Sequence, residues 1–237
     1  MDPFAASDIV IVDETEKCPY LPEETARMPL RMPKARISRR EADLRLAQGH
    51  RRTGEFVYRT ECPSCQACEP IRIDCTEFTF SRNQRRALNK GDRTLVQRLG
   101  PLEYDAQRID LFNKHRRMRG LAKLDSDIDT KGYVWGFVQS CFDSFEITYW
   151  QDERIVCVAV CDIGATCLSA VYTFFDPEMA KAGLGTYSIL KQIEFCQIQS
   201  LRYVYLGYYV AGSPHMQYKS RFTPHERLID GEWNRYS

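Results

Sequence analysis

Residues 166–200 of the chain read TCLSAVYTFFDPEMAKAGLGTYSILKQIEFCQIQS, and this stretch sets the architecture. Its first ten residues are rich in β-branched and aromatic side chains, which predicts a strand. Residues 176–185, DPEMAKAGLG, contain proline and glycine and predict a loop. Beyond that loop apolar side chains return at helical spacing, for example at Ile189 and Ile193. A strand, a glycine-containing loop and a helix therefore follow one another here.

The segments on either side of this stretch extend the same pattern. Upstream, the sequence predicts helices at 103–120 and 133–142 and then consecutive strands at 145–150 and 154–163. Downstream, residues 202–210 alternate aromatic and aliphatic side chains and predict a further strand. This order of elements predicts an α+β fold class, with a mainly antiparallel sheet flanked by helices.

The first hundred residues are expected to form a half of their own. Residues 1–35 contain prolines that interrupt any helix, so we expect them to be irregular. Ser38 stands three residues before Glu41, a capping box that begins a predicted helix. Further elements are predicted as strands at 55–59, 71–75 and 93–99, and as a helix at 81–91 that ends at Gly91. We therefore predict a cysteine-containing, basic domain over residues 1–100 and a second domain over residues 101–237.

The composition, with 43% hydrophobic and 27% charged residues, is typical of globular proteins. The N-terminal segment MDPFAASDIVIVDETEKC is acidic and lacks the basic flank and long apolar core of a signal peptide. No apolar run approaches the 18 or so residues that a membrane helix needs. We therefore expect a cytoplasmic protein with no membrane partner. Its ten cysteines are then ligands or free thiols rather than disulfides.

Charge is spread unevenly along the chain. Residues 1–26 carry one basic and seven acidic side chains, whereas residues 27–98 carry 17 basic and 8 acidic ones. The basic block is richer in Arg than in Lys, and Arg suits bidentate contacts with phosphate or carboxylate. The block is either a solvated surface or a binding surface for a polyanion, above all RNA.

A cluster of cysteines interrupts the basic block. Cys62, Cys65 and Cys68 stand at three-residue spacing within RRTGEFVYRTECPSCQACEPIRID, residues 51–74. Such spacing fits a metal site, redox chemistry, or the remnant of a site that no longer binds anything. The spacing alone leaves these alternatives open.

The succession of strands, glycine-containing loop, helix and strand resembles the N-acetyltransferase (GNAT) superfamily. In that superfamily the loop receives the pyrophosphate of acetyl-CoA on free amides at the helix N-terminus. The segment AKAGLG supplies Gly183 and Gly185 but has Ala180 where that motif begins with Gln or Arg. The resemblance therefore implies a GNAT-type scaffold that uses a donor other than acetyl-CoA.

Five ordered blocks carry a more specific resemblance. They are CPYLP, RRTGEFVYRTECPSCQACEPIRI, FTFSRNQRRALNK, VYTFFDPEMAKAGLGTYSILKQIE and YVYLGYYVAGSPHMQYKSRFTPHE. Together they resemble the aminoacyl-tRNA–protein transferases of the N-degron pathway, above all the bacterial leucyltransferase branch. The resemblance implies transfer of leucine from leucyl-tRNA to the α-amine of proteins beginning with Asp or Glu, which marks them for degradation. It also implies two GNAT-like halves and no cofactor required for transfer.

The residues suit this chemistry. An aminoacyl ester is already activated, so its aminolysis needs little beyond positioning and charge stabilisation. An α-amine has a pKa of about 7.7–8.0, so a useful fraction is uncharged near pH 7. No Ser-His-Asp or Cys-His arrangement is evident. The four histidines are expected to be structural or on the surface, although His115 lies in a basic segment that would also suit tRNA phosphate.

Cations are expected to hold the carboxylate of the acceptor's acidic first residue. Two basic segments, SRNQRR and QYKSRF, would have to converge to supply them, and the candidates are Arg82, Arg85, Arg86 and Arg221. In the second segment Tyr218 and Lys219 are the candidate catalytic residues. The first segment is alternatively a solvated helix face or a surface that contacts the tRNA backbone.

The leucyl-tRNA donor is expected to lie against the glycine loop and the aromatic strand. Gly183 and Gly185 are the candidate loop contacts. Tyr208 and Tyr209 are candidates for stacking on the terminal adenosine of the tRNA or for shaping a leucyl pocket. Packing in a half-buried strand is the alternative role for these tyrosines.

The cysteines also have an interpretation within the family. Cys62, Cys65 and Cys68 resemble part of an iron–sulfur ligand run, and Cys18 would add a fourth thiolate. Four thiolates also suit zinc. Either group is expected to pin the N-terminal segment and to take no part in catalysis, and free structural thiols are the alternative. The rival functions are arginyl transfer, acetyl transfer, and a metal-dependent RNA-binding module without catalysis.

Overall fold

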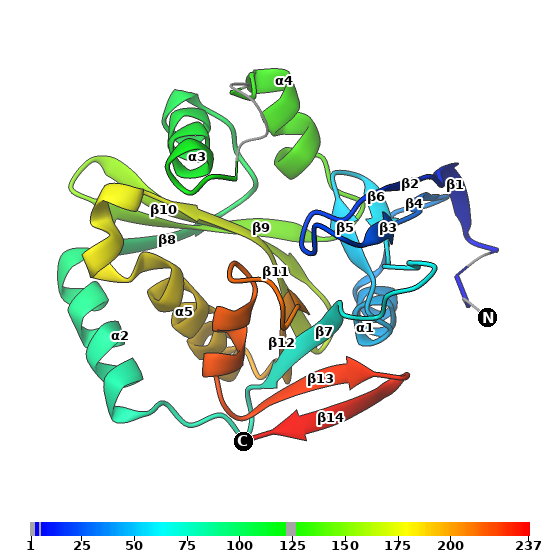
Figure 1. Ribbon diagram of the computed structural model, residues 1–237. Coiled ribbons are helices and arrows are strands. Elements are labelled where there is room, and N and C mark those ends of the chain that lie inside the picture. Colours follow the sequence, from blue (N-terminus) through cyan, green and yellow to red (C-terminus); the bar gives the residue numbers. More distant parts are fainter. Residues whose placement is uncertain (1–2, 5, 122–126) are drawn as a thin grey trace.

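The computed structural model describes residues 3–4, 6–121 and 127–237 (Figure 1). Its strands, in chain order, are β1 (Asp8–Val12), β2 (Thr15–Lys17), β3 (Thr25–Arg27), β4 (Leu30–Pro33), β5 (Arg51–Thr53), β6 (Phe56–Tyr58), β7 (Glu69–Asp74), β8 (Val96–Gly100), β9 (Ser144–Gln151), β10 (Arg154–Ile163), β11 (Cys167–Phe175), β12 (Tyr203–Tyr209), β13 (His225–Ile229) and β14 (Glu232–Tyr236). The α-helices are α1 (Arg39–Ala47), α2 (Arg82–Thr94), α3 (Ala106–Met118), α4 (Thr130–Tyr133) and α5 (Leu184–Ile198). A π-helix, η1 (Val134–Val138), and the 3₁₀ helices η2 (Pro177–Ala182) and η3 (Gln217–Arg221) complete the described elements.

One large sheet organises the molecule. Its eight strands stand in the order β14-β13-β7-β12-β11-β10-β9-β8, and every neighbouring pair is antiparallel except β11 and β12. Helices α2 and α5 cover one face of this sheet, and α3 and α4 lie over the other (Figure 1). An apolar core fills each interface, around Leu190 under α5 and around Phe112 under α3. The predicted α+β class is confirmed.

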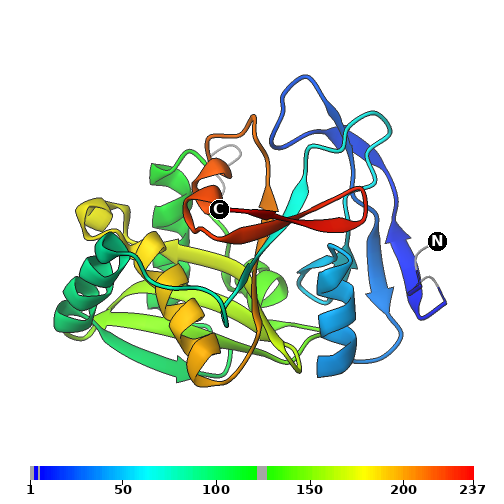
Figure 2. The same cartoon turned by 90° about the horizontal axis from the view of Figure 1, so that it is seen from below.

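The first hundred residues contribute directly to that sheet. Strand β7 lies between β12 and β13, and β8 forms the far edge beside β9. Figure 2 shows β7 crossing beneath the β13–β14 hairpin at the side of the molecule that carries α2 and α5. The division into domains at residue 100 stays a prediction, but the main sheet takes strands from both sides of it.

The N-terminal segment is more regular than the sequence predicts. Residues 8–33 form β1 to β4, with β1 and β4 in a four-stranded sheet of order β1-β4-β6-β5 and β2 and β3 in a hairpin. The prolines do exclude helix here, but they stand where a strand tolerates them. Pro19, Pro22 and Pro29 lie between strands, and Pro33 is the last residue of β4.

Helix α1 fastens this smaller sheet to the large one. Ser38 caps the helix by accepting the backbone N–H of Glu41 at 3.2 Å, as the sequence predicts. Arg45 is fully buried and pairs with Asp8 of β1 at 2.7 Å. On the opposite side Asp43 accepts the backbone N–H of Thr166 at 3.0 Å, just before β11. Helix α1 therefore connects strand β1 of the smaller sheet with the start of β11 in the large sheet.

Most predicted elements occur at the expected places, and three of them differ in extent or in type. Helix α2 continues through Gly91 to Thr94. Gly91 does not end the helix but leaves room for the Tyr187 ring, which packs where a side chain would stand. The predicted helix at 133–142 is a short α-turn followed by η1. The predicted loop at 176–185 contains η2 and the first residues of α5. The sequence predicts no element beyond residue 222, where the β13–β14 hairpin lies.

No helix within the described ranges is both long enough and apolar enough to cross a bilayer.

Candidate functional site

The two parallel strands of the large sheet separate partway along their length. β11 and β12 pair only between Cys167–Ser169 and Tyr203–Tyr205. Beyond that point β12 continues against β7 with a register shift between Tyr205 and Tyr208, where Gly207 has a φ of +86°. Parting strands leave backbone groups without ladder partners, so other groups must satisfy them. Side chains from other elements therefore enter the opening between β11 and β12.

Arg51 of β5 reaches into this opening. Its guanidinium donates to the Ser169 hydroxyl at 3.0 Å and to the Ala170 carbonyl at 2.8 Å, on the last paired residue of β11 and on the first residue beyond the paired region. The residue is buried, with 8% of its surface exposed. Nothing in the sequence indicated this role, because the contacts join residues more than 110 positions apart.

Lys219 of η3 occupies the other side of the same opening. Its Nζ donates to the Tyr208 carbonyl of β12 at 2.6 Å and lies 3.5 Å from the Met216 sulfur. A Cβ added to Gly207 would lie 3.4 Å from an Arg51 nitrogen and 3.6 Å from Lys219 Nζ. Because Gly207 has no side chain, the Arg51 guanidinium and the Lys219 amine can both lie close to its backbone.

The electrostatics of Lys219 differ from those of an ordinary surface lysine. Only 6% of the residue is exposed, and burial, followed by the positive charge of Arg51, lowers its pKa to about 7. Within the described residues, the hydrogen bonds of both cations go to neutral groups and no carboxylate pairs with either. An amine with such a pKa is partly uncharged at neutral pH and can accept a proton.

The candidate tyrosines lie around this opening with different exposures. Tyr208 is buried, its hydroxyl donates to the Gly49 carbonyl at 3.1 Å, and its ring faces Tyr58 at 6.5 Å between centroids. Tyr209 is half-buried beneath the Arg227 guanidinium, 4.6 Å from its ring. Tyr218 is 39% exposed, and Lys219 Nζ lies 6.0 Å from its ring centroid. Packing therefore occupies Tyr208 and Tyr209, whereas Tyr218 is partly exposed beside the amine and has a hydroxyl whose pKa is raised by burial.

The glycine loop stands at the end of β11. Gly183 adopts a φ of +68° and begins α5 without a side-chain cap. A Cβ at Gly185 would lie 3.1 Å from the ring of Phe175, the last residue of β11. The second glycine therefore lets the start of the helix approach the strand, and the role of Gly183 and Gly185 as donor contacts stays a prediction.

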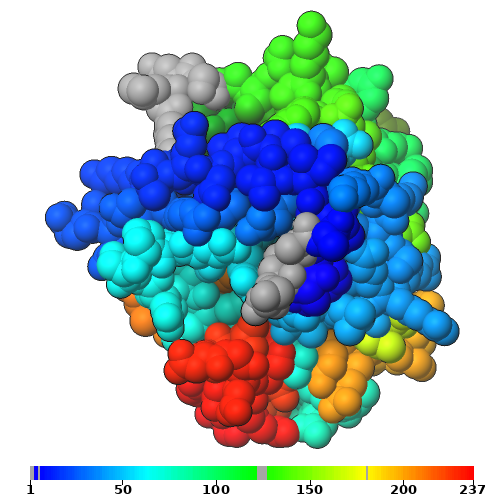
Figure 3. All heavy atoms as spheres, turned by 90° about the vertical axis from the view of Figure 1, so that its right-hand side faces the viewer, coloured from blue at the N-terminus to red at the C-terminus, as the bar shows by residue number. Residues whose placement is uncertain are grey.

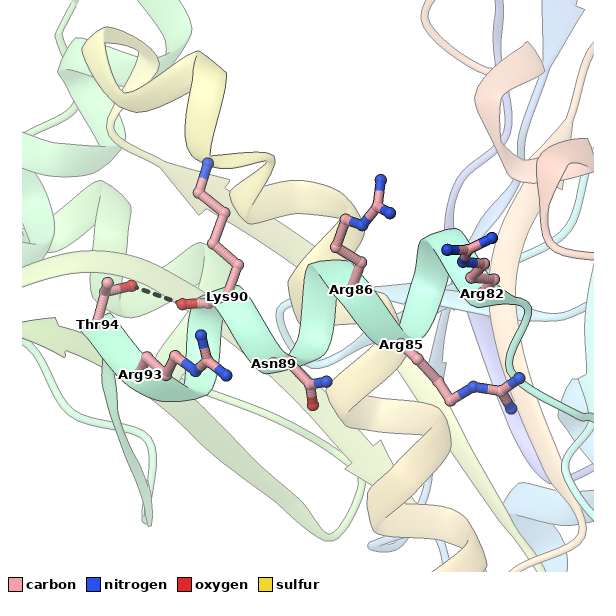
Figure 4. A pocket seen from close by; sticks show the side chains of 7 residues that line it. All are labelled: Arg82, Arg85, Arg86, Asn89, Lys90, Arg93 and Thr94. Atoms are coloured by element: carbon pink, nitrogen blue, oxygen red, sulfur yellow. Dashed lines mark hydrogen bonds between the residues drawn. The ribbon is translucent and has the colours of Figure 1, made fainter.

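The basic segment SRNQRR forms the N-terminal half of α2, capped by Ser81 and Gln84 in a complete capping box. A shallow cavity of about 630 Å³ runs along the helix, and Figure 4 shows the side chains that line it: Arg82, Arg85, Arg86, Asn89, Lys90, Arg93 and Thr94. The one acidic residue of α2, Asp92, accepts a bond from Tyr187 and pairs with Lys191 of α5. We call Arg82, Arg85, Arg86, Lys90 and Arg93 the α2 stripe.

The two basic segments do not share one cavity. The α2 stripe lines a cavity with residues of its own helix, whereas Lys219 lies in the opening beside Arg51. Arg221 is exposed at the end of η3. Among the described residues no hydrogen bond or ion pair joins the α2 stripe to η3. The carboxylate-binding role of Arg82, Arg85, Arg86 and Arg221 stays a prediction.

The candidate metal ligands gather at the edge of the same site. Cys62, Cys65 and Cys68 lie in the loop between β6 and β7, and Cys18 follows β2. Burial, and then the nearby Cys18, Cys62 and Cys65 thiols, raise the pKa of Cys68 to about 12, while Lys219 acts on it in the opposite direction. Backbone N–H groups of Leu21 and Arg27 point at the sulfurs of Cys18 and Cys62, at 3.4 and 3.5 Å.

These cysteines do not form a closed ligand set. No group of three or more His, Cys, Asp or Glu side chains in the described ranges stands at metal-binding spacing. The Cys62–Cys68 loop instead lines a groove of about 800 Å³ against Leu228–Gly231 of the β13–β14 turn. Figure 3 shows this loop, in cyan, directly beside the red hairpin.

Three of the four histidines are buried away from solvent, and only His215, just before η3, is exposed. His50, His115 and His225 are buried, and His115 Nδ1 lies within hydrogen-bonding distance of the Phe175 backbone. Burial lowers the pKa of His115, so it stays uncharged near neutral pH. A contact between His115 and tRNA phosphate, which its basic segment suggested, is excluded by its 3% exposure.

Solved structures of low sequence identity share this fold. The chain aligns at a TM-score of 0.50 and 12% identity with L-PGS from Bacillus licheniformis, covering 72% of this chain and 59% of that one. The C-terminal domain of a lysylphosphatidylglycerol synthetase from Agrobacterium fabrum aligns at the same TM-score with 11% identity. These likenesses show a shared fold, in which two parallel strands part beside a glycine-led helix.

Two family models then account for most of the sequence. "Arginine-tRNA-protein transferase, N terminus" matches residues 16–86, and "Arginine-tRNA-protein transferase, C terminus" matches residues 107–229. The chain belongs to this family of aminoacyl-tRNA–protein transferases.

Curated relatives lie in its leucyltransferase branch. The aspartate/glutamate leucyltransferase of Acinetobacter baumannii is 38% identical over 221 residues, 92% of this chain and 80% of that protein. Those of Thiobacillus denitrificans and Nitrosococcus oceani are 37% and 36% identical, over 91% and 92% of this chain and 90% and 92% of theirs. The predicted family and the aminoacyltransferase class are confirmed.

Proposed function

We propose that the protein transfers leucine from leucyl-tRNA to the N-terminal α-amine of proteins that begin with Asp or Glu. The acceptor nitrogen forms a bond to the ester carbonyl carbon, and the bond from that carbon to the tRNA ribose oxygen breaks. The proton that the amine loses ends on the ribose oxygen. The observation that carries the proposal is the buried Lys219 amine between the parting strands β11 and β12.

Lys219 is the residue that handles the proton. With a pKa of about 7 it is partly uncharged, and so it can take a proton from the attacking amine and return it to the leaving ribose oxygen. Tyr218 lies beside it and is partly exposed, where it can stack on the terminal base of the donor. We assign Tyr208 and Tyr209 to the walls of the leucyl pocket, in keeping with their burial.

The donor's terminal phosphates are assigned to the start of α5. Gly183 leaves the first turn of that helix without a side-chain cap, and free amides at a helix N-terminus favour anions. Lys90 Nζ donates to the Lys181 carbonyl of η2 at 3.2 Å, which places the α2 stripe next to this loop. A tRNA that enters along α2 therefore reaches the glycine loop with its acceptor end.

The α2 stripe is the tRNA-docking surface in this proposal. Its arginines are exposed and stand three or four positions apart, where like charges destabilise a helix unless an anion lies against them. Replacing Arg85 and Arg93 together by Gln is expected to reduce the slope of log affinity against log salt by about two, one for each phosphate that the variant no longer neutralises. Arg235→Gln, an exposed arginine of β14, is the matched control.

Single variants of the same helix test the role that the sequence suggested for this segment. If Arg82→Gln, Arg85→Gln or Arg86→Gln loses the preference for Asp over Asn at the peptide N-terminus while tRNA affinity holds, the segment binds the acceptor carboxylate. A reduced salt slope with an unchanged preference supports tRNA docking.

We further propose that Cys18, Cys62, Cys65 and Cys68 hold zinc or an iron–sulfur cluster that fixes the N-terminal segment. The four thiols lie near one another and two backbone N–H groups point at sulfur, so the cysteines would close around such a group on binding, and the group is not needed for transfer. Metal analysis and a visible spectrum of anaerobically purified protein test this. Absence of iron and zinc, with all four thiols titrating, contradicts it.

One assay separates the candidate functions. Purified protein is incubated with labelled leucyl-tRNA or arginyl-tRNA and with peptides that begin with Asp, Glu, Lys or Ala, in cytoplasm-like reducing buffer. We expect leucine to appear only on the Asp and Glu peptides. Transfer only from arginyl-tRNA favours the arginyl branch, and no transfer from either tRNA refutes the proposal.

A further inference from the structure

Arg51 and Lys219 form a pair of buried cations without a counter-charge. Arg51 is 8% and Lys219 6% exposed, and the hydrogen bonds of both in the described structure go to neutral acceptors. The other buried arginines of the N-terminal half show the contrast. Arg45 pairs with Asp8 and Arg52 with Asp162, at 2.7 and 2.9 Å.

Such a pair is costly unless an anion completes it. Removing a charge from water is unfavourable, and the attraction of an opposite charge normally offsets that cost. Two neighbouring positive charges in the opening make the cost larger, since they also repel each other. Of the five N–H groups of Arg51, two are used by Ser169 and Ala170, which leaves donors for a carboxylate.

We propose that Arg51 binds the side-chain carboxylate of the acceptor's first residue while Lys219 faces the α-amine of the same residue. This deepens the proposed function and rests on it. The inference names a residue of β5 as the determinant of acidic specificity, in place of a separate basic surface.

The separation of the two cations fits a single amino acid. The position that a Cβ of Gly207 would occupy lies 3.4 Å from Arg51 and 3.6 Å from Lys219, so the two nitrogens are at most about 7 Å apart. Asp and Glu carry their carboxylate one or two methylene groups from the α-carbon that bears the amine. Both groups of one residue can therefore reach both cations at hydrogen-bonding distance.

The pairing also links recognition to chemistry. The charge of Arg51 is one of the causes that hold the pKa of Lys219 low. A carboxylate bound to Arg51 offsets that charge, so an acidic first residue raises the pKa of Lys219 and stabilises the state in which Lys219 holds the proton taken from the amine. An Asn acceptor has nearly the same shape but no charge, and it leaves the pKa of Lys219 lower.

The test compares two variants that differ in charge. Arg51→Gln and Arg51→Lys both lose the guanidinium contacts with β11, but only Lys keeps a positive charge. For each, kcat/KM for leucine transfer is measured with peptides identical except for Asp or Asn at the N-terminus. We expect Arg51→Gln to lose about tenfold to a hundredfold of the Asp preference, the range of a charge-assisted hydrogen bond, and Arg51→Lys to keep most of it.

Controls keep the inference separate from the proposed function. Wild-type protein must first transfer leucine to the Asp peptide, and if it does not, the proposed function fails rather than this inference. Arg235→Gln is expected to keep the full preference. If Arg51→Gln transfers leucine with an undiminished Asp preference, or if Arg51→Lys and Arg51→Gln lose it equally, the assignment of the carboxylate to Arg51 is overturned. Should Arg51→Gln fail to fold, the preference of the Arg51→Lys variant alone decides.

Discussion

Replacing Lys219 by Met is expected to make the protein more stable and nearly inactive. The folded site holds the pKa of Lys219 at about 7, whereas an unfolded chain restores the ordinary value near 10.4. At 1.36 kcal/mol for each pH unit, keeping the ammonium charged in the fold costs roughly 5 kcal/mol well below pH 7. Losing the bond to the Tyr208 carbonyl costs about 1–3 kcal/mol, so the net gain is about 2–4 kcal/mol at pH 6.

The gain must depend on pH with a definite sign. Between pH 7 and about 10 the unfolded chain binds a proton that the folded protein does not, so the stability of the wild type rises with pH. Met does not titrate. The gain in free energy of unfolding of Lys219→Met over wild type therefore falls by about 1.36 kcal/mol for each pH unit above 7 and nearly vanishes at pH 9. Urea unfolding at pH 6 and pH 9 measures both differences.

Lys191 is the matched control for this experiment. It is partly buried but pairs with Glu194 and Asp92, and those partners raise its pKa. Lys191→Met is therefore expected to destabilise the protein, and equally at pH 6 and pH 9, because Lys191 stays charged at both. Loss of the proton acceptor in Lys219→Met is expected to lower kcat by about 10²–10⁴-fold. A Lys219→Met protein that is less stable than wild type by the same amount at both pH values refutes the reasoning.

Two further predictions concern the scaffold. Gly91→Ala is expected to lower the free energy of unfolding by about 1–3 kcal/mol despite the better helix propensity of Ala, because the new Cβ would lie 2.2 Å from the Tyr187 ring. Gly100→Ala, whose Cβ meets no atom within 4 Å, is the near-neutral control in urea unfolding, and equal effects would contradict the packing argument. Asp8→Asn is expected to cost about 1.5–3 kcal/mol because it leaves the buried Arg45 guanidinium with only the partly exposed Glu41 as a charge partner. A thermal unfolding midpoint unchanged from wild type would show that the pair contributes nothing.

Local features of the sequence predicted local structure well. The Ser38 cap, the start of α2 next to Ser81 and the strands of the large sheet depend on neighbours within a few positions. The same holds for Arg82, Arg85 and Arg86, because helix geometry alone brings residues three and four apart close together. Lys219 was a candidate from its basic, aromatic surroundings, but its burial was not predictable from them.

Arg51 shows why the rest could not be predicted. It stands in a short strand beside Arg52, and both residues are buried although arginine carries a charge and usually lies at the surface. Their difference lies in partners brought from afar: Asp162 for Arg52, and the neutral groups of Ser169 and Ala170 for Arg51. Which of the two arginines meets a carboxylate depends on how β5 packs against the strands of the C-terminal half. No spacing within the sequence carries that information.

The position of β7 inside the large sheet constrains the order in which the chain folds. Its neighbours β12 and β13 are synthesised near the end of the chain. The hydrogen bond from Arg72 to Glu226 spans 154 residues. At a ribosomal rate of roughly 5–20 residues per second, Arg72 waits about 8–30 s for that partner. During this time β7 has no sheet, and its Ile71 and Ile73 side chains, fully buried in the complete protein, are exposed to chaperones and to neighbouring chains. Nascent protein halted before residue 200 is therefore expected to aggregate or to be held by a chaperone, whereas the complete chain closes its sheet around a strand synthesised early.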